Sequence, residues 1–354
     1  MASKWNYGKW NKVSDLSSGG QAITYIVVEA GEEDLPANRR VLKRLKNPKR
    51  KNRFEAELQA GLTLSHPNIV KVVDHDLNND PPYIVSEYCS GGSLEGAIDI
   101  IKGMDLGARL SLFRSICDGV AHAHQNNPSI IHRDIKPDNI FLRNPGLIPA
   151  VGDFGLCFIE DGERVTLFDE QVGSRFYMPP ELADGKAEDV TTRSDVYSLG
   201  KVLYWLASGG KIFDREQHEA PKYNLTTDRL NPAYFMLNAL LRKAITYNPL
   251  DRFENAAILS QKISKLILQV DAKGNHIDIN TPQQCSFCRI GKYDIRIDMR
   301  NASGEKFDHM KWQLERFGLS RNGEPRWIIM VCDNCAHVAF FRPDLSANQD
   351  AWKK

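Results

Sequence analysis

A short polar stretch between two apolar segments constrains this chain more than any other feature. Residues 130–142 read I-I-H-R-D-I-K-P-D-N-I-F-L, with an imidazole, a guanidinium, two carboxylates, an ammonium and an amide between Ile131 and Ile140. Charged groups are rarely buried unless they are paired or bind a metal, so this density indicates a functional loop. The apolar residues on both sides predict two short strands that hold the loop. The alternative is a charged surface turn.

A second loop, V-G-D-F-G at residues 151–155, follows the first. Together the two loops resemble the catalytic loop and the D-F-G metal loop of protein kinases. This resemblance implies that Asp134 holds the acceptor hydroxyl and that Lys136 neutralises charge on the transferred phosphoryl group. It also implies that Asn139 and Asp153 bind Mg²⁺, a hard ion that prefers carboxylate, amide and phosphate oxygens.

The segment 17–24, S-S-G-G-Q-A-I-T, occupies the position of the kinase glycine loop, G-x-G-x-x-G-x-V. By resemblance Gly19 and Gly20 cover the phosphates of ATP, although Ser17 and Ala22 replace the outer glycines. Residues with a Cβ resist positive φ, so we expect a stiffer loop and a weak affinity for ATP. An ordinary hairpin is the alternative.

A lysine and a glutamate further along the chain complete the expected nucleotide site. Arg40–Leu45 predicts a strand, with Lys43 in the slot of the kinase V-A-I-K lysine. Phe54–Ser65 has the apolar period of a helix. The family spacing selects Glu57, rather than Glu55, as the ion-pair partner of Lys43.

Residues 83–89, Y-I-V-S-E-Y-C, predict a strand that runs into a glycine-containing turn. The resemblance makes this the hinge that binds adenine through backbone groups. It places Ser86 at the gatekeeper position and Glu87 and Cys89 among the ATP-binding residues.

Two amphipathic helices are predicted after the hinge, at Leu106–His124 and Asn255–Val270. The first ends in His122 and His124, which we interpret as helix-end or packing histidines.

The segment M-P-P-E at 178–181 resembles the A-P-E motif, whose glutamate, Glu181 here, pairs in the family with an arginine at the position of Arg252. Asp195 has two interpretations. It is either an acid near a helix cap or the buried acid by which the family orients the catalytic-loop backbone, and the second is favoured.

The residues around the expected activation segment suggest how the enzyme is controlled. Kinases with an arginine before the catalytic aspartate, Arg133 here, need an anion that neutralises it. Counting back four residues from Ser174, in G-S-R-F-Y, leads to Glu170, whose carboxylate is a weaker but permanent substitute for phosphate. Phosphorylated Thr166 is the next candidate for the neutralising anion. The alternative is that Asp169 and Glu170 form a solvated acidic turn without a regulatory role.

Four of the seven cysteines form two C-x-x-C pairs near the C-terminus, separated by 43 residues. In a reducing compartment such pairs indicate metal ligands before disulfides. Four thiolates at Cys285, Cys288, Cys332 and Cys335 predict a tetrahedral Zn²⁺ site in a zinc-ribbon-like β domain. Redox-active or free cysteines are the alternative.

Charge and apolar patterning give no support for a nucleic-acid-binding tail, a membrane span or a secreted protein. The net charge is +1, and residues 281–354 carry 12 Lys and Arg against 9 Asp and Glu, so nucleic-acid binding by the tail is possible but not supported by charge. The sequence contains no apolar run long enough to span a membrane and no secretory signal, so we expect a cytoplasmic location. The oligomeric state and the ligand of the tail are left open.

These features predict an α+β chain with a two-lobed protein kinase fold and a small β domain. The kinase domain is expected at 1–270, with a mainly β lobe to about residue 85 and a mainly α lobe over about 90–270, a linker at 271–284 and the zinc domain at 285–354. The expected function is transfer of the γ-phosphate of ATP, with Mg²⁺, to serine or threonine hydroxyls of protein substrates. Lys136 resembles the serine/threonine branch.

Two alternatives stay open. The first is a pseudokinase scaffold whose zinc tail binds protein or nucleic acid, suggested by the two replaced glycines. The second is a small-molecule kinase of the aminoglycoside type, which lacks the M-P-P-E context.

Overall fold

The computed structural model describes residues 5, 7–18, 22–154, 174–186, 189–225 and 232–271, and the short segments 293–297, 320–321, 324–325, 328–332 and 338–341. The chain forms two compact units, Met1–Glu216 with Ala244–Gln261 and Gln217–Lys243 with Lys262–Lys354. The first unit contains a β-sheet lobe followed by a helical lobe, as predicted.

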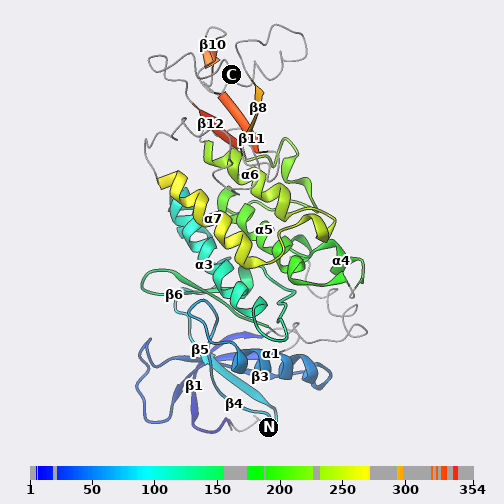
Figure 1. Cartoon of the computed structure of the whole chain (residues 1–354). Helices are drawn as coiled ribbons and strands as arrows, with labels where there is room; N and C mark the ends of the chain where they lie inside the picture. The colour runs from blue at the N-terminus through cyan, green and yellow to red at the C-terminus, as the bar shows by residue number, and fades with distance from the viewer. Residues whose placement is uncertain are drawn as a thin grey trace. The chain divides into compact units, whose positions relative to one another are not determined.

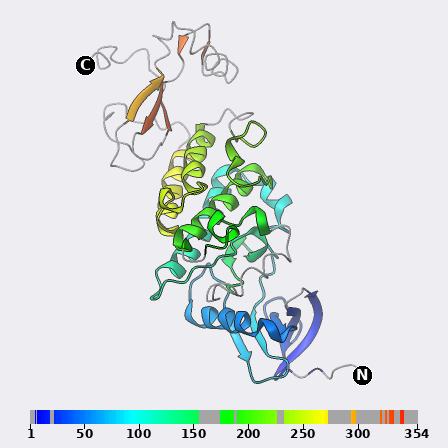
Figure 2. The same cartoon turned by 90° about the vertical axis from the view of Figure 1, so that its right-hand side faces the viewer.

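The small lobe is a five-stranded antiparallel sheet with the order β1-β2-β3-β5-β4 (Figure 1). Its strands are β1 (Trp10–Ser18), β2 (Ala22–Glu29), β3 (Arg40–Leu45), β4 (Val72–Asp76) and β5 (Tyr83–Glu87). Helix α1 (Lys51–Thr63) lies beside the sheet (Figures 1 and 2), where Phe54 and Leu58 pack with Leu45 and Ile84. Burial of these side chains fixes the helix that carries Glu57.

A cluster of aromatic side chains packs around the first strands of the small lobe. Trp5 stacks edge-on against Tyr7 and Tyr25, with ring centroids 4.6 and 5.0 Å away. Trp10 Nε1 donates to Asp74 Oδ2 at 2.7 Å, which joins the two edge strands of the sheet. In a flat sheet these edges would be roughly 19 Å apart, so the sheet is strongly coiled.

The helices that follow the sheet are α2 (Ile98–Gly103), α3 (Leu106–His124), α4 (Pro180–Ala183), α5 (Thr192–Ser208), α6 (Pro232–Ala244) and α7 (Ala256–Asp271). Short 3₁₀ turns occur at Pro48–Arg50, Pro137–Asn139, Ser174–Phe176, Gln217–Glu219 and Pro249–Asp251. Helix α3 begins after Asp105, whose Oδ1 accepts the Ala108 N–H at 2.8 Å and so satisfies one open donor of the first turn.

Helix α5 is the centre of the helical lobe. Thr191 and Ser194 form a capping box at its start, and Gly209 closes it in the left-handed conformation with φ of 76°. Every residue from Ser194 to Ser208 is buried. Because α3 packs against α5, residues at the end of α3 and the start of α5 are held close together.

The predicted strands on either side of the polar loop are only partly as expected. Ile130 and Ile131 are not in a strand, whereas β6 (Ile140–Arg143) pairs with β7 (Ile148–Val151) in a two-stranded hairpin. The loop therefore lies between the end of α3 and β6, and β7 leads into the second loop.

In the C-terminal region the described segments are short strands (Figure 2). Strands β8 (Tyr293–Ile297), β11 (Ile328–Cys332) and β12 (Val338–Phe341) form an antiparallel sheet with the order β12-β11-β8. A second pair joins β9 (Ser320–Arg321) to β10 (Glu324–Pro325).

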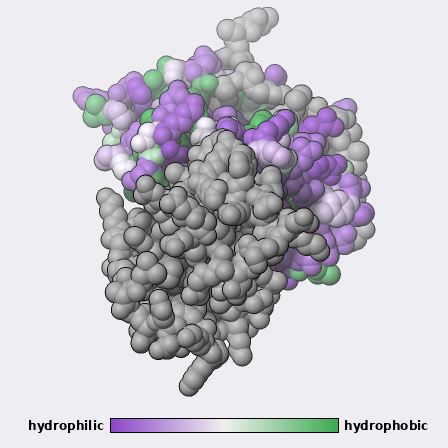
Figure 3. Space-filling view, turned by 90° about the horizontal axis from the view of Figure 1, so that it is seen from above, coloured by the Kyte–Doolittle hydropathy of each residue, from purple (hydrophilic) through white to green (hydrophobic). Residues whose placement is uncertain are grey.

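Among the described helices, none is both long enough and apolar enough to cross a bilayer. The described surface visible in Figure 3 is mainly hydrophilic, with hydrophobic residues scattered among polar ones.

Candidate active site

Asp134 is the centre of the polar loop. Asn139 donates its Nδ2 to the backbone oxygen of Asp134 at 2.7 Å and to its carboxylate Oδ2 at 2.9 Å. Lys136 Nζ lies 3.0 Å from the same Oδ2. Lys136 and Asn139 are buried, so the carboxylate is held in one orientation by two donors from its own loop.

The backbone of this loop is held by Asp195 at the start of α5. Its carboxylate accepts the N–H groups of His132 and Arg133, each at 2.8 Å. It also lies 2.9 Å from His124 Nε2. Because His124 Nδ1 accepts the Ala256 N–H at 3.3 Å, the ring proton is on Nε2 and points to Asp195.

Asp195 is completely buried. Burial by itself would raise the pKa of Asp195, but the hydrogen bond from His124, the electrostatic influence of the His124 and His132 rings and the N–H of Arg133 outweigh it and lower the pKa. The loop-orienting interpretation of Asp195 is therefore confirmed, and Thr191 with Ser194 forms the helix cap instead. The interpretation of His124 as a packing histidine was incomplete, because its ring is a hydrogen-bond partner of this buried acid.

Lys43 joins the small lobe to the second loop. Its Nζ lies 2.6 Å from Glu57 Oε2 on α1, which is the predicted ion pair, and 3.4 Å from Asp153 Oδ1. All three side chains are about three-quarters buried or more, with between 17% and 27% of the side chain exposed. The ammonium therefore faces two carboxylates, one from α1 and one from the second loop.

The polar loop and the D-F-G loop are hydrogen-bonded to each other. Gly152 N donates to the Asn139 oxygen at 2.9 Å, and the Gly152 oxygen lies 3.0 Å from His132 Nε2. The Phe154 ring packs on His132, with centroids 4.5 Å apart. Asp153, between them, has φ of 61°, a left-handed conformation that is uncommon outside glycine and that the surrounding contacts must hold.

The glycine-loop segment is described only at its ends. Gly19 and Gly20 lie outside the described residues, while Ser17 pairs with Thr24 across β1 and β2. Ala22 is buried in β2 opposite Leu45 and does not have positive φ. The expected conformational penalty of a Cβ therefore does not apply at Ala22.

The predicted hinge begins as strand β5. Ser86 lies inside the sheet between Val41 and Val72. Cys89 is buried, and burial together with the charge of Glu87 raises the pKa of its thiol to about 12. A thiol with so high a pKa is protonated at neutral pH and is a packing group.

The Glu87 side chain has a partner that the sequence analysis missed. Arg143, at the end of β6, donates Nε and Nη2 to the two Glu87 oxygens at 2.8 and 2.6 Å. The only signal in the sequence is an arginine that follows the apolar strand after the catalytic-loop motif.

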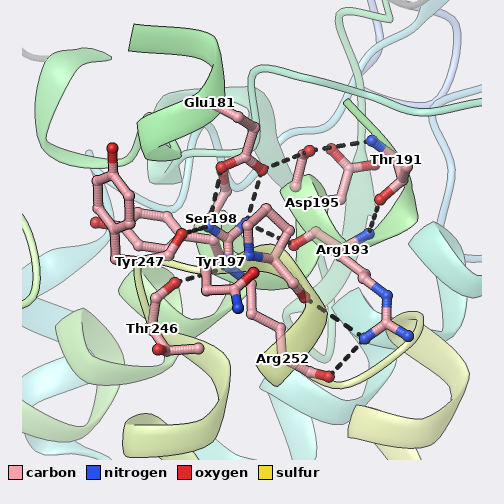
Figure 4. Close-up of polar contacts among 12 residues, drawn as sticks. Glu181, Thr191, Arg193, Asp195, Tyr197, Ser198, Thr246, Tyr247 and Arg252 are labelled. Atoms are coloured by element: carbon pink, nitrogen blue, oxygen red, sulfur yellow. Dashed lines mark hydrogen bonds and ion pairs between the residues drawn. The ribbon is translucent and has the colours of Figure 1, made fainter. Parts of the chain in front are cut away.

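Glu181 and Arg252 form the predicted ion pair (Figure 4). Arg252 Nη1 and Nη2 lie 2.7 and 2.9 Å from the two Glu181 oxygens, and both side chains are almost completely buried. Ser194 Oγ donates to Glu181 at 2.7 Å, and the Arg252 guanidinium lies 4.9 Å from the centre of the Tyr197 ring. This pair anchors the M-P-P-E segment to α5.

Several predicted residues lie outside the described part of the chain. These are Thr166 and Glu170 of the activation segment and Cys285, Cys288 and Cys335 of the metal site. Ser174 begins a 3₁₀ turn and Cys332 ends β11, but only their backbone is described. Within the described residues, no group of three or more His, Cys, Asp or Glu side chains is placed to hold a metal ion.

Comparisons with known proteins agree with this arrangement. The model of the protein kinase domain family matches residues 10–271. The serine/threonine-protein kinase PrkC of Bacillus subtilis is 32% identical over 266 residues, which cover 70% of this chain and 39% of that protein. The serine/threonine-protein kinase PknB of Mycobacterium leprae is 34% identical over 217 residues, which cover 58% of this chain and 34% of that protein.

A solved structure shares the fold. The crystal structure of the kinase domain of Mycobacterium tuberculosis PknI, a double mutant, matches 75% of this chain and 99% of that chain with a TM-score of 0.57 and 23% identity. The chain belongs to the protein kinase family, and its kinase domain is similar in sequence to those of these two serine/threonine-protein kinases. The matched region spans less than half the length of these two relatives.

Proposed function

We propose that this chain transfers the γ-phosphoryl group of ATP to serine and threonine hydroxyls of protein substrates. The observation that carries this proposal is the convergence of Lys43, Glu57 and Asp153 beside a loop in which Asn139 and Lys136 hold the Asp134 carboxylate. Phosphoryl transfer requires positioning and charge neutralisation more than covalent help, and these groups supply both.

Each residue has a distinct role in this proposal. Asp134 accepts the proton of the substrate hydroxyl and aligns it for in-line attack, while Lys136 neutralises charge on the transferred group. Lys43, oriented by Glu57, binds the inner phosphates. The backbone groups of Glu87 and Cys89, with Ser86 as gatekeeper, hold adenine, and Gly19 and Gly20 cover the phosphates. These hinge and glycine-loop roles rest on the family resemblance.

Asn139 and Asp153 are the residues that would hold Mg²⁺. Asn139 turns Nδ2 toward Asp134, which leaves the amide oxygen as the atom that would bind the metal. A carboxylate and an amide oxygen fit a hard ion that keeps its other ligands from phosphate and water. When bound, Mg²⁺ would neutralise charge on the ATP phosphates.

The test is transfer of labelled γ-phosphate to a mixed protein substrate, followed by identification of the phosphorylated amino acid. We expect phosphoserine and phosphothreonine, and a loss of roughly 10²–10⁴-fold in kcat for Asp134→Ala. Asp153→Ala should also weaken MgATP binding. Full activity in either folded variant would contradict the roles. A wild-type chain that binds ATP without transfer would favour the pseudokinase alternative.

We also propose a linker at 271–284, whose first residue is the last residue of α7, and a domain at 285–354 that binds one Zn²⁺ through Cys285, Cys288, Cys332 and Cys335. Cys332 is the last residue of β11, and Cys335 precedes Val338, the first residue of β12, in the sequence. Thiolate coordination suits the reducing cytoplasm, where we place the protein. We further propose that this domain recognises a protein substrate or partner, because its charge gives no support for nucleic acid.

Metal analysis of freshly purified protein tests the zinc proposal. We expect close to one zinc per chain and its loss in Cys332→Ser, with the kinase activity kept, because the metal supplies the folding energy of such a small domain. Protein that contains no zinc would contradict it.

The activation residues carry a separate proposal. We propose that Glu170 neutralises Arg133, so that activity is largely independent of phosphorylation; the support is the four-residue spacing from Ser174. The enzyme is treated with phosphatase, checked by mass and assayed beside Glu170→Ala and Thr166→Ala. If phosphatase or Thr166→Ala silences the enzyme while Glu170→Ala does not, Thr166 is the switch.

A further inference from the structure

The ion pair between Arg143 and Glu87 connects three separate segments. Glu87 ends β5, and its Oε1 also accepts the backbone N–H of Lys71 at 2.7 Å. Arg143 Nη2 donates to the Ile69 oxygen at 3.0 Å, and Nη1 donates to the Pro67 oxygen. The pair thus ties the end of β5 and strand β6 to the connection between α1 and β4.

Two backbone segments near this pair, one after β5 and one before β4, are hydrogen-bonded to the β6–β7 hairpin. On one side, Gly91 N donates to the Leu142 oxygen and Leu142 N donates to the Gly92 oxygen, both at 2.8 Å. A Cβ at Gly91 would lie 2.8 Å from the Leu142 backbone, so only glycine permits this approach. On the other side, Val151 N donates to the Asn68 oxygen at 2.9 Å.

The chemistry of the pair favours a fixed geometry. Both side chains are about three-quarters buried, with 25% of Arg143 and 23% of Glu87 exposed. Burial by itself would raise the pKa of Glu87, but the bonds from Arg143 and the Lys71 N–H outweigh it and lower the pKa. Only a guanidinium can reach both carboxylate oxygens and two carbonyl oxygens at once, because an ammonium is a point charge with three donors.

We infer that Arg143 and Glu87 form a positioning pair that fixes the hinge backbone for ATP. This inference rests on the proposed function. Neither side chain is assigned a contact with the reacting atoms. Hinge atoms that are held in place before binding do not have to be ordered by the ligand, so the pair should affect ATP binding rather than phosphoryl transfer.

The experiment uses the full chain with Arg143→Lys, Glu87→Gln and the double variant. KM for ATP, kcat, Kd for a fluorescent ATP analogue and Tm are measured for each. We expect each single variant to raise KM and Kd roughly tenfold while kcat stays within about twofold. Because the two groups act as one unit, the double variant should resemble either single variant instead of showing the product of the two effects.

Arg242→Lys is the matched control. Arg242 donates Nε to Glu219 at 3.0 Å in an exposed ion pair of the other compact unit, and neither residue is assigned to the site. We expect this variant to bind ATP like the wild type. Two results would overturn the inference: a lower Tm in Arg143→Lys with unchanged KM and Kd, or effects of the two substitutions that multiply in the double variant.

The wild-type chain separates this inference from the proposed function. A wild type that binds and uses ATP, beside variants with unaltered KM and Kd, refutes the positioning pair alone. A wild type that shows no ATP binding refutes the proposed function, and the inference falls with it.

Discussion

Asp195 holds the backbone of Arg133 in a conformation that arginine rarely adopts. Arg133 has φ of 68°, and its N–H donates to Asp195 Oδ1 at 2.8 Å. The left-handed conformation costs about 1–2 kcal/mol for a residue with a Cβ. A hydrogen bond to a charged acceptor contributes about 1.5–3 kcal/mol, which is enough to offset that cost. The turn that presents Asp134 therefore depends on an acid in α5.

The first prediction concerns Asp195→Asn. An amide offers one acceptor oxygen where the carboxylate offers two, so one of the N–H groups of His132 and Arg133 loses its partner. We expect a loss of about 1–3 kcal/mol in the free energy of unfolding and a larger effect on kcat than on KM. Urea unfolding and steady-state kinetics measure both. Asp99→Asn, at an exposed pair on α2, is the control, and equal effects in the two variants would contradict the prediction.

The second prediction is acid destabilisation through Glu87. Its pKa is lowered in the folded state, so its contribution to stability is fully present above the pKa of the unfolded chain and is lost as the pH falls through the folded pKa. The difference in free energy of unfolding between wild type and Glu87→Gln should therefore be constant near neutral pH and shrink below about pH 4. Urea unfolding at a series of pH values measures this difference. A difference that persists unchanged to pH 2 would show that Glu87 does not act through its charge.

The third prediction concerns Lys201, a buried lysine in α5. Its Nζ donates to the Phe213 and Arg215 oxygens at 2.9 and 2.7 Å, and burial lowers its pKa to about 7. The unfolded chain therefore binds one more proton than the folded chain between about pH 7 and pH 10, so the free energy of unfolding should rise with pH over this range. Lys201→Met should remove that rise. Unfolding curves from pH 6 to pH 10 provide the measurement, and an identical slope in the variant would refute the assignment.

The fourth prediction concerns the buried pair of Glu181 and Arg252. Arg252→Met leaves the Glu181 carboxylate buried without its partner, so we expect a loss of about 3–5 kcal/mol in the free energy of unfolding. Replacing both residues by methionine should cost less than the sum of the two single substitutions. The exposed pair of Arg242 and Glu219 provides the control, because Arg242→Met should change the free energy of unfolding by no more than about 1 kcal/mol. Additive losses would show that the two residues are not coupled.

Local sequence was sufficient to predict which polar side chains gather around Asp134. The spacing of Asp134, Lys136 and Asn139 is set by the covalent chain, and a short loop offers few ways to arrange three polar groups around one carboxylate. The strand and helix patterns around Lys43 and Glu57 likewise place both residues before any tertiary contact is known. The family resemblance rests on these local features, which is why the kinase domain was predictable from the sequence.

The tertiary structure alone decided which distant groups meet. Arg143 reaches Glu87 across 56 residues, and Lys201 binds carbonyls of a loop beyond its own helix. The helix pattern predicts a helix-end or packing role for His124, because such a pattern shows burial but not the identity of the neighbour on another helix. Hydrogen bonds form only within a few tenths of an ångström of 2.9 Å. Such distances depend on the packing of α3 against α5 and on the register of β6 beside the hinge, and neither is encoded within a short segment of sequence.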